Sequence, residues 1–230
     1  MRLELDVGNT RIKWRLCDHR GRFDGGLDLK QILLEAPAWV SLVEDVWVSS
    51  VDDAHNGWIA EQFPQAQFAH TQVAHLGLSN SYQDPHKMGV DRWLVMLAAW
   101  HKNPDQVNIV VDAGTAITLD IVDAFGRHVG GYICPGFQMM KTTLLEQTNK
   151  VLAEAPWQIG RAPGQSTQQC VDHGIQDMVA CWIEHHRVLQ PEAKVWMTGG
   201  NAEALSTLLV EPVELVSDLV LDGLQVHFLK

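Results

Sequence analysis

Two stretches of the sequence repeat one pattern, and this repeat constrains the fold more than any other feature. Residues 6–22 read D-V-G-N-T-R-I-K-W-R-L-C-D-H-R-G-R, and residues 112–127 read D-A-G-T-A-I-T-L-D-I-V-D-A-F-G-R. Each copy opens with Asp-x-Gly, continues through an apolar stretch and closes on Asp-x-x-Gly-Arg. The opening aspartates lie 106 residues apart in a chain of 230, which predicts two related halves. The alternative is two unrelated hairpins, because Asp and Gly are common turn residues.

Each copy is expected to form a β-hairpin. Leu3–Leu5 and Asn108–Val111 supply the first strands, the Asp-x-Gly turns follow, and Asp18–Gly21 and Asp123–Gly126 form second turns. The first copy alternates apolar with basic residues, namely Ile12, Trp14 and Leu16 with Arg11, Lys13 and Arg15. This alternation predicts a strand with one apolar face and one basic face.

The rest of the chain alternates predicted strands and helices, which indicates an α/β fold. Further strands are expected at residues 46–51, 132–134 and 195–198, and helices at 56–63, 91–101, 137–147, 170–186 and 202–209. Asn103-Pro104-Asp105 interrupts the pattern. We therefore expect an N-terminal half at residues 1–105 and a C-terminal half at 106–230.

The composition of the chain excludes some classes of binding partner and indicates a cellular compartment. The net charge of −11 and pI near 5.3 disfavour nonspecific binding to nucleic acids or anionic membranes. No stretch approaches the roughly 18 apolar residues of a membrane span. Acidic residues stand where a signal peptide would need an apolar run, and the four cysteines form no C-x-x-C pair. We expect a cytoplasmic protein without nucleic-acid or membrane partners.

The Asp-x-Gly turns carry a specific chemistry. A glycine lets backbone N–H groups approach an anion, and the adjacent carboxylate can hold a divalent cation that neutralises phosphate. Thr10 and Thr115 add hydroxyl donors, and Lys13 adds a positive charge. One such turn carries little information, but two of them could hold the phosphates of a nucleotide from both sides.

Gly89-Val90-Asp91-Arg92 lies between the two hairpins at the expected start of a helix. The helix dipole and nearby amides favour an ionised carboxylate at this place, and such an Asp can accept a hydroxyl proton during phosphoryl transfer. The alternative is a helix-capping Asp beside a surface Arg. Thr198-Gly199-Gly200 suits a loop against which adenine could lie, although a plain strand-to-helix turn would read the same way.

Four ordered motifs together resemble one known family. They are Asp6 to Trp14, Gly89-Val90-Asp91-Arg92, Asp112-Ala113-Gly114-Thr115-Ala116-Ile117-Thr118 and Gly130-Gly131-Tyr132-Ile133-Cys134-Pro135-Gly136. Motifs of this kind occur in this order in type III pantothenate kinases, and the resemblance extends from residue 3 to about residue 205. It implies an acetate-kinase/actin/Hsp70-like fold of two ribonuclease-H-like halves flanking a central cleft.

The resemblance also implies an activity and a set of ligands. Members of this family use ATP to phosphorylate pantothenate to 4′-phosphopantothenate, the first step of coenzyme A synthesis. The expected cofactors are Mg²⁺ with ATP and a monovalent cation, K⁺ or NH₄⁺. A homodimer is expected, because a substrate-binding threonine of the family is usually reached from the partner subunit.

Residue roles follow from the same resemblance. Asp91 is the expected proton acceptor. The expected ATP-binding residues are Asp6, Val7, Gly8, Asn9, Thr10, Arg11, Ile12, Lys13 and Thr115. The expected pantothenate-binding residues are Tyr82, Gly89, Val90, Asp91, Arg92 and Thr167. Asp6 is expected near Mg²⁺, and Asp112 is expected to hold K⁺.

Two positions depart from the family pattern. Ser166 stands where Asn is common, and Asn201 follows Gly200 where an acid is frequent, which weakens the assignments of Thr167 and of the adenine loop. Two other functions remain open on the sequence. One is a noncatalytic regulator of the same fold, and the other is a kinase for another small hydroxyl substrate or a phosphohydrolase.

Overall fold

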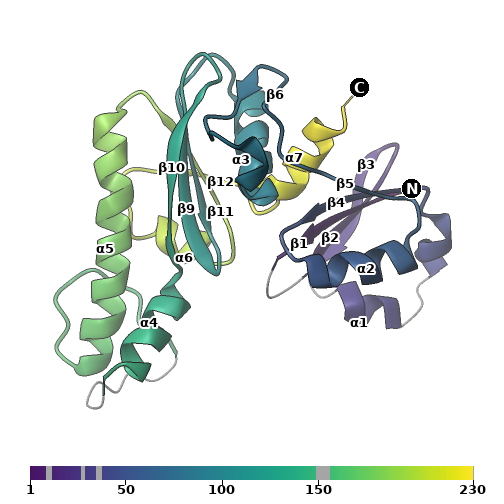
Figure 1. The fold of residues 1–230 in the computed structure, drawn as a ribbon. Coiled ribbons are helices and arrows are strands. Elements are labelled where there is room, and N and C mark those ends of the chain that lie inside the picture. Colours follow the sequence, from purple (N-terminus) through teal and green to yellow (C-terminus); the bar gives the residue numbers. More distant parts are fainter. Residues whose placement is uncertain (9–11, 27–28, 35–37, 149–155, 230) are drawn as a thin grey trace. The chain divides into compact units, whose positions relative to one another are not determined.

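The computed structural model describes residues 1–8, 12–26, 29–34, 38–148 and 156–229. These residues form two compact units (Figure 1). Unit 1 consists of Met1–Lys102 together with Asp218–Lys230, and unit 2 consists of Asn103–Ser217. Each unit contains one five-stranded sheet.

Unit 1 is built on a mixed sheet with the strand order β3-β2-β1-β4-β5. Its strands are β1 (Arg2–Val7), β2 (Ile12–Asp18), β3 (Gly21–Gly26), β4 (Asp45–Ser50) and β5 (Ala66–Phe68), with a small separate pair, β6 (Ala74–His75) and β7 (Leu78–Ser79). Its helices are α1 (Leu29–Leu34), α2 (Asp53–Gln62), α3 (Val90–Lys102) and α7 (Leu219–His227), with short 3₁₀ turns η1 (Ala38–Leu42) and η2 (Pro85–Lys87). Strand β1 pairs antiparallel with β2 and parallel with β4.

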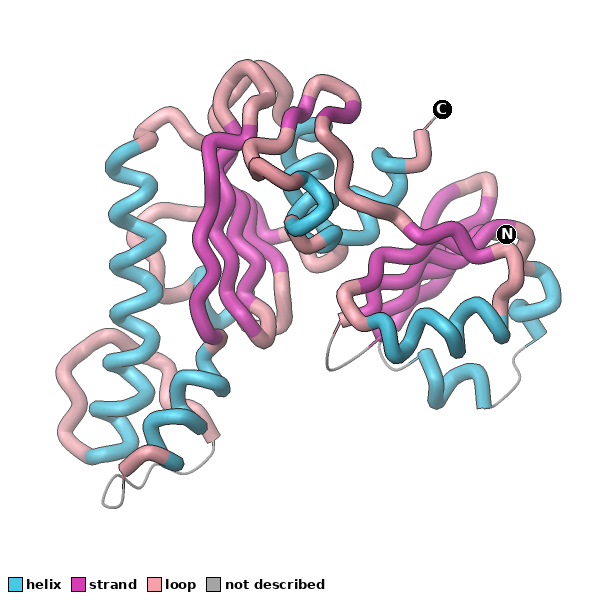
Figure 2. Tube along the Cα trace, viewed as in Figure 1, coloured by secondary structure: helices cyan, strands magenta, loops and turns pink. Residues whose placement is uncertain are grey.

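The alternation of side chains places different chemistry on the two faces of this sheet. Leu3, Leu5 and Val7 are buried in a core that α1 and α2 cover, as Figure 2 shows. The apolar residues of β2 join the same core, which confirms the apolar face expected for that strand. On the other face, Glu4 and Arg15 are buried and form ion pairs, and α7 packs there.

Unit 2 repeats the same arrangement in the order β10-β9-β8-β11-β12. Its strands are β8 (Asn108–Ala113), β9 (Ala116–Val122), β10 (His128–Pro135), β11 (Lys194–Thr198) and β12 (Glu214–Leu215). Its helices are α4 (Phe137–Glu146), α5 (Thr167–Leu189) and α6 (Ala202–Ser206). Strand β8 pairs antiparallel with β9 and parallel with β11, as β1 pairs with β2 and β4. Ile109, Val111 and Ala113 face a core to which α4, α5 and α6 contribute.

The shared topology confirms the two related halves that the repeat predicted. Both Asp-x-Gly segments link the first two strands of a sheet, and both closing Asp-x-x-Gly segments link the second strand to the third. Gly21 and Gly126 adopt φ values of 118° and 76° in these second turns, which other residues rarely adopt.

The division of the chain differs in one respect from a single boundary at residue 105. The chain leaves unit 1 after Lys102, and the segment from Asp218 packs back into unit 1. The cause is α7, whose buried apolar residues lie against α3. Gly223 makes this approach possible, because a side chain there would overlap the backbone of Leu94. Among the described helices, none is long and apolar enough to cross a bilayer.

Candidate active site

The first acidic turn begins at the end of β1. Asp6 lies opposite Lys13 of β2 on one side and opposite Ser49 of β4 on the other. Their side chains therefore point to the same face of the sheet, the one that α7 covers. Of the predicted ATP-binding residues, Asp6, Val7, Gly8, Ile12 and Lys13 belong to this hairpin, whereas Asn9, Thr10 and Arg11 lie outside the described residues.

The second acidic turn has the equivalent position in unit 2. Asp112 lies opposite Thr118 of β9 and Thr198 of β11. The turn is closely packed, since the amide of Gly136 donates to the carbonyl of Thr115 at 2.9 Å. A side chain at Gly136 would overlap that carbonyl, and one at Gly199 would overlap the Asp112 carboxylate and the backbone of Ala113.

Each acidic residue lies next to a buried hydroxyl group. Ser49 and Thr118 are buried, and neither hydroxyl has a hydrogen-bond partner among the described residues. A carboxylate beside a free hydroxyl oxygen is a donor set that suits a hard cation, which completes its shell with water and phosphate oxygens. Asp6 and Asp112 thus supply oxygen donors of the kind that hard cations take.

Lys13 is held by a residue that the sequence did not single out. Its Nζ lies 2.5 Å from Oδ1 of Asp218, and Nη1 of Arg22 lies 2.6 Å from Oδ2 of the same carboxylate. Burial would raise the pKa of Asp218, but the hydrogen bond from Lys13 and the charges of Lys13, Arg22 and Arg15 outweigh it and hold that pKa below its usual value. The basic face expected for β2 is thus matched by acidic residues of α7.

Asp91 lies in the first turn of α3, as expected. Its Oδ1 accepts a hydrogen bond of 2.7 Å from the amide of Arg92. A side chain at Gly89 would overlap this carboxylate oxygen, so glycine leaves the space that the carboxylate occupies. The amide of Trp93 bonds to the carbonyl of Gly89, and the helix thereby begins directly behind the carboxylate. The helix N-terminus stabilises the ionised form of Asp91.

Arg92 joins this turn to the preceding loop. It is buried, its Nη1 donates to the hydroxyl of Tyr82 at 2.6 Å, and its guanidinium lies 5.6 Å from the centre of the Tyr82 ring. Arg92 is therefore not a surface residue. This excludes one part of the alternative interpretation, in which a helix-capping Asp91 lies beside a surface arginine. The structure brings together four of the residues predicted to bind pantothenate: Tyr82, Gly89, Asp91 and Arg92. Val90, also predicted, is buried in the first turn of α3.

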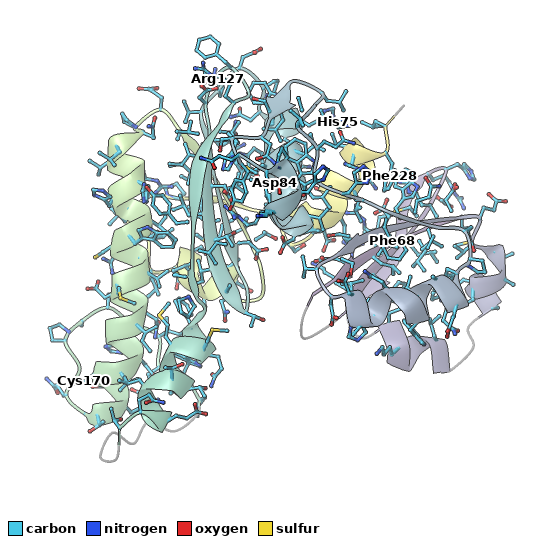
Figure 3. The ribbon with its side chains drawn as sticks, viewed as in Figure 1. Phe68, His75, Asp84, Arg127, Cys170 and Phe228 are labelled. Atoms are coloured by element: carbon cyan, nitrogen blue, oxygen red, sulfur yellow. The ribbon has the colours of Figure 1, made fainter. Side chains whose placement is uncertain are left out.

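Thr167 is the first residue of α5 in unit 2. Ser166 caps this helix, since its hydroxyl accepts a hydrogen bond from the amide of Gln169 at 3.2 Å. Ser and Asn are equally good helix caps, so the departure at Ser166 preserves the helix start. Thr167 lines an open hollow of about 360 Å³ between α4 and α5, together with Leu144, Cys170, Val171, Gly174, Ile175 and Met178. Cys170 is labelled at this end of α5 in Figure 3.

The Gly199-Gly200 loop forms a tight connection between β11 and α6. Gly199 has a φ of 97°, and the amide of Asn201 donates to the carbonyl of Ala113 at 2.9 Å. Asn201 departs from the family pattern in its side chain, but its backbone amide still links this loop to the second acidic turn. Whether adenine lies on this loop stays a prediction.

The fold and the paired turns define the class of protein. Two sheets of equal topology, each with an acidic turn after its first strand, form the acetate-kinase/actin/Hsp70-like fold. A Campylobacter jejuni protein described as a Baf family transcriptional activator has a similar fold, with a TM-score of 0.66 at 20% identity, covering 97% of this chain and 95% of that one. The activator of 2-hydroxyisocaproyl-CoA dehydratase from Clostridium difficile, solved with bound ADPNP, has a TM-score of 0.51 at 10% identity over 98% of this chain and 94% of that one.

Sequence comparison identifies the family within this class. The type III pantothenate kinase family model matches residues 2–187. Type III pantothenate kinases from Marinobacter nauticus and Hahella chejuensis are 36% and 34% identical to the chain, covering 98% and 97% of it and 97% and 95% of their own lengths. The chain belongs to the type III pantothenate kinase family.

Proposed function

We propose that this protein transfers the γ-phosphoryl group of ATP to the primary hydroxyl of pantothenate and so makes 4′-phosphopantothenate for coenzyme A synthesis. Family membership along most of the chain supports the reaction and the substrates. The observation that carries the assignment of the chemistry is the turn at Gly89, where the absence of a side chain leaves room for the Asp91 carboxylate. This fixed carboxylate supports the assignment of Asp91 as the group that meets the substrate hydroxyl.

Asp91 acts as the proton acceptor. Its Oδ1 is held by the amide of Arg92, so the carboxylate has a fixed orientation. It orients the pantothenate hydroxyl for in-line attack and takes its proton while the phosphoryl group is transferred. Phosphoryl transfer has a loose transition state, so positioning and charge stabilisation supply most of the rate enhancement. Tyr82, Gly89, Val90 and Arg92 form the adjoining substrate pocket in this proposal.

Each acidic turn binds phosphate in this proposal. Asp6 to Lys13 form the first phosphate-binding segment, and Thr115 contributes from the second. Mg²⁺ near Asp6 and K⁺ or NH₄⁺ near Asp112, when bound, supply positive charge that screens the phosphates. The buried hydroxyls of Ser49 and Thr118 support these cation assignments.

The working form is a homodimer in the cytoplasm. The apolar hollow along α5 supports the dimer, because Met178 is 57% exposed there and an exposed apolar surface favours association. Thr167 at the rim of the hollow then serves the pantothenate site of the partner subunit. The four cysteines are unpaired, which suits a reducing compartment.

An acceptor screen tests the proposal. Purified protein with ATP, Mg²⁺ and K⁺ is offered pantothenate, short hydroxy acids and sugars, and ADP release is followed. We expect release with pantothenate and a lower rate when Na⁺ replaces K⁺. Release that ignores pantothenate would indicate a phosphohydrolase, release with another acceptor would indicate another kinase, and no release would favour a noncatalytic regulator.

A further inference from the structure

The ion pairs between β2, β3 and α7 place a residue with no assigned role next to the proposed phosphate site. Asp218 receives Lys13 on one carboxylate oxygen at 2.5 Å and Arg22 on the other at 2.6 Å. The side chain of Asp218 is 10% exposed, whereas those of Lys13 and Arg22 are 28% and 56% exposed. The anion therefore lies beneath two cations that remain accessible to a solute.

The backbone of Asp218 is held in place by helix α7, which begins at the next residue. The amide of Asp222 bonds to the carbonyl of Asp218 at 2.8 Å, and α7 is fixed against α3 by the close contact of Gly223 with Leu94. A helix N-terminus also favours a negative charge. Asp218 is thus a fixed anchor point for the longer, more flexible cationic side chains.

A lysine side chain loses rotamer entropy when it is fixed in one geometry. If Lys13 were free, this cost would fall on each nucleotide that binds. Because the ion pair with Asp218 already orders the Lys13 amine when the protein folds, nucleotide binding does not have to order it. Lys13 and Arg22 together carry two positive charges against the single negative charge of Asp218.

We propose that Asp218 is a positioning residue that presents Lys13 to the phosphates of ATP. The proposal rests on the role of Lys13 in the proposed function. Asp218 does not touch the nucleotide in this account, and its effect passes entirely through the lysine.

Asp222 supplies a matched control from the same helix, one turn further on. It pairs with Arg15 at 2.7 Å and with Lys102 at 2.9 Å. Arg15 is buried and also pairs with Glu4, so this second set of ion pairs joins α7 to the sheet without involving Lys13. Asp218 and Asp222 therefore separate the positioning of Lys13 from the attachment of α7.

The test compares Asp218→Asn, Asp218→Glu, Asp222→Asn and Lys13→Ala in the full-length protein. The measurements are the KM values for ATP and pantothenate, the Kd of MgATP by calorimetry, and Tm. We expect Asp218→Asn to raise the KM and Kd for ATP by about 5- to 20-fold, the range of one charge-assisted contact, with the KM for pantothenate changed less than about twofold. Asp222→Asn should lower Tm and leave the KM for ATP unchanged.

The outcomes separate this inference from the proposed function. If Lys13→Ala leaves ATP binding unchanged, the first phosphate site itself is wrong. If Lys13→Ala weakens ATP binding but Asp218→Asn leaves the KM for ATP unchanged or lowers it, Asp218 is only a structural contact or a competitor of phosphate, and the inference is overturned.

If Asp218→Asn does not fold, Asp218→Glu decides, because it keeps the charge but displaces the amine of Lys13. We expect Asp218→Glu to raise the KM for ATP two- to fivefold, which corresponds to about half the loss of binding free energy expected for Asp218→Asn. An unchanged KM for ATP would overturn the inference.

Discussion

Asp91 and Gly89 form one functional unit at the scale of single residues. The carboxylate occupies the space that a side chain at position 89 would fill, and the amide of Arg92 fixes one of its oxygens. The carboxylate is the group proposed to meet the substrate hydroxyl. The proposed base needs a fixed orientation, and the hydrogen bond at the start of α3 provides one.

Replacement of this base should slow the chemical step without unfolding the protein. We expect Asp91→Asn to lower kcat by about 10²- to 10⁴-fold, because the amide cannot take the proton. Steady-state kinetics with ATP and pantothenate measures the loss, and circular dichroism checks the fold. Asp84→Asn is the control, since Asp84 starts the nearby turn η2 and is exposed. Near-wild-type turnover of Asp91→Asn would remove Asp91 from the mechanism.

The sequence located these residues in their elements better than it predicted their partners. Gly-x-Asp-Arg at a helix start indicated a fixed carboxylate, and the helix does begin there. The ion pair of Lys13 with Asp218 joins residues that are distant in the chain. No local pattern carries such a contact, because it depends on how α7 packs. The buried hydroxyls of Ser49 and Thr118 were missed for the same reason, since they become neighbours of the acidic residues only through strand pairing.

At the scale of elements, the sequence predicted most helices and the central strands, but it missed α1, α7 and the edge strands β3, β5 and β12. The helix predicted at 170–186 lies within α5, and the strand predicted at 195–198 lies within β11. The edge strands β3, β5 and β12 are short or rich in glycine, so their patterns are weak. Helix α7 was missed because LVLDGLQVH combines an apolar run with a central glycine, and the glycine has a purpose only once α3 lies beside it.

The last turn of α7 should make stability depend on pH. His227 is buried, and its ring centre lies 5.8 Å from that of His70 and 5.6 Å from that of His75. Figure 3 labels His75 and Phe228, the residue after His227. Burial, followed by the charges of His75 and His70, lowers the pKa of His227 from 6.5 to about 4. Between these values the unfolded chain binds a proton that the folded chain does not, so stability falls as the pH drops.

We expect His227→Phe to remove up to about 3 kcal/mol of this loss between pH 6.5 and 4. Urea unfolding of the wild type and of His227→Phe across this pH range measures the free energy of unfolding of each. The difference between the two cancels the titration of the carboxylates that both proteins share. His19→Phe serves as the control, because His19 is exposed in the turn between β2 and β3. Parallel pH profiles for wild type and His227→Phe would contradict the assignment.

The cap of α5 offers a second prediction for an element. Ser166→Ala removes the side-chain acceptor of the Gln169 amide and should lower the free energy of unfolding by about 1 kcal/mol. Ser166→Asn should restore it, since Asn caps equally well. Chemical denaturation compares the three proteins. Equal stability of the alanine variant would show that the cap contributes nothing.

At the scale of the whole molecule, the internal repeat predicted the most. Two copies of one motif at half the chain length indicated two related halves, and both sheets have the same strand order. The return of the chain from unit 2 into α7 left no trace in the repeat, because α7 has no counterpart within it. The family resemblance named the reaction, and the type III pantothenate kinase family model confirms that membership.

The proposed dimer makes a prediction at this scale. A lysine in place of Met178 would put a charge into the hollow along α5, and desolvation of that charge opposes association. We expect Met178→Lys to sediment as a monomer and to lose activity, because Thr167 could no longer serve a partner. Val210→Lys, at another exposed apolar position of unit 2, should remain a dimer. A fully active monomer would exclude the shared site.

The most direct measurement is the product formed from ATP and pantothenate. Purified protein with Mg²⁺ and K⁺ is incubated with both substrates, and mass spectrometry follows pantothenate and its phosphorylated form. We predict that 4′-phosphopantothenate accumulates in step with ADP in the wild type and scarcely at all with Asp91→Asn. Folded wild-type protein that leaves pantothenate unmodified under these conditions would contradict the account.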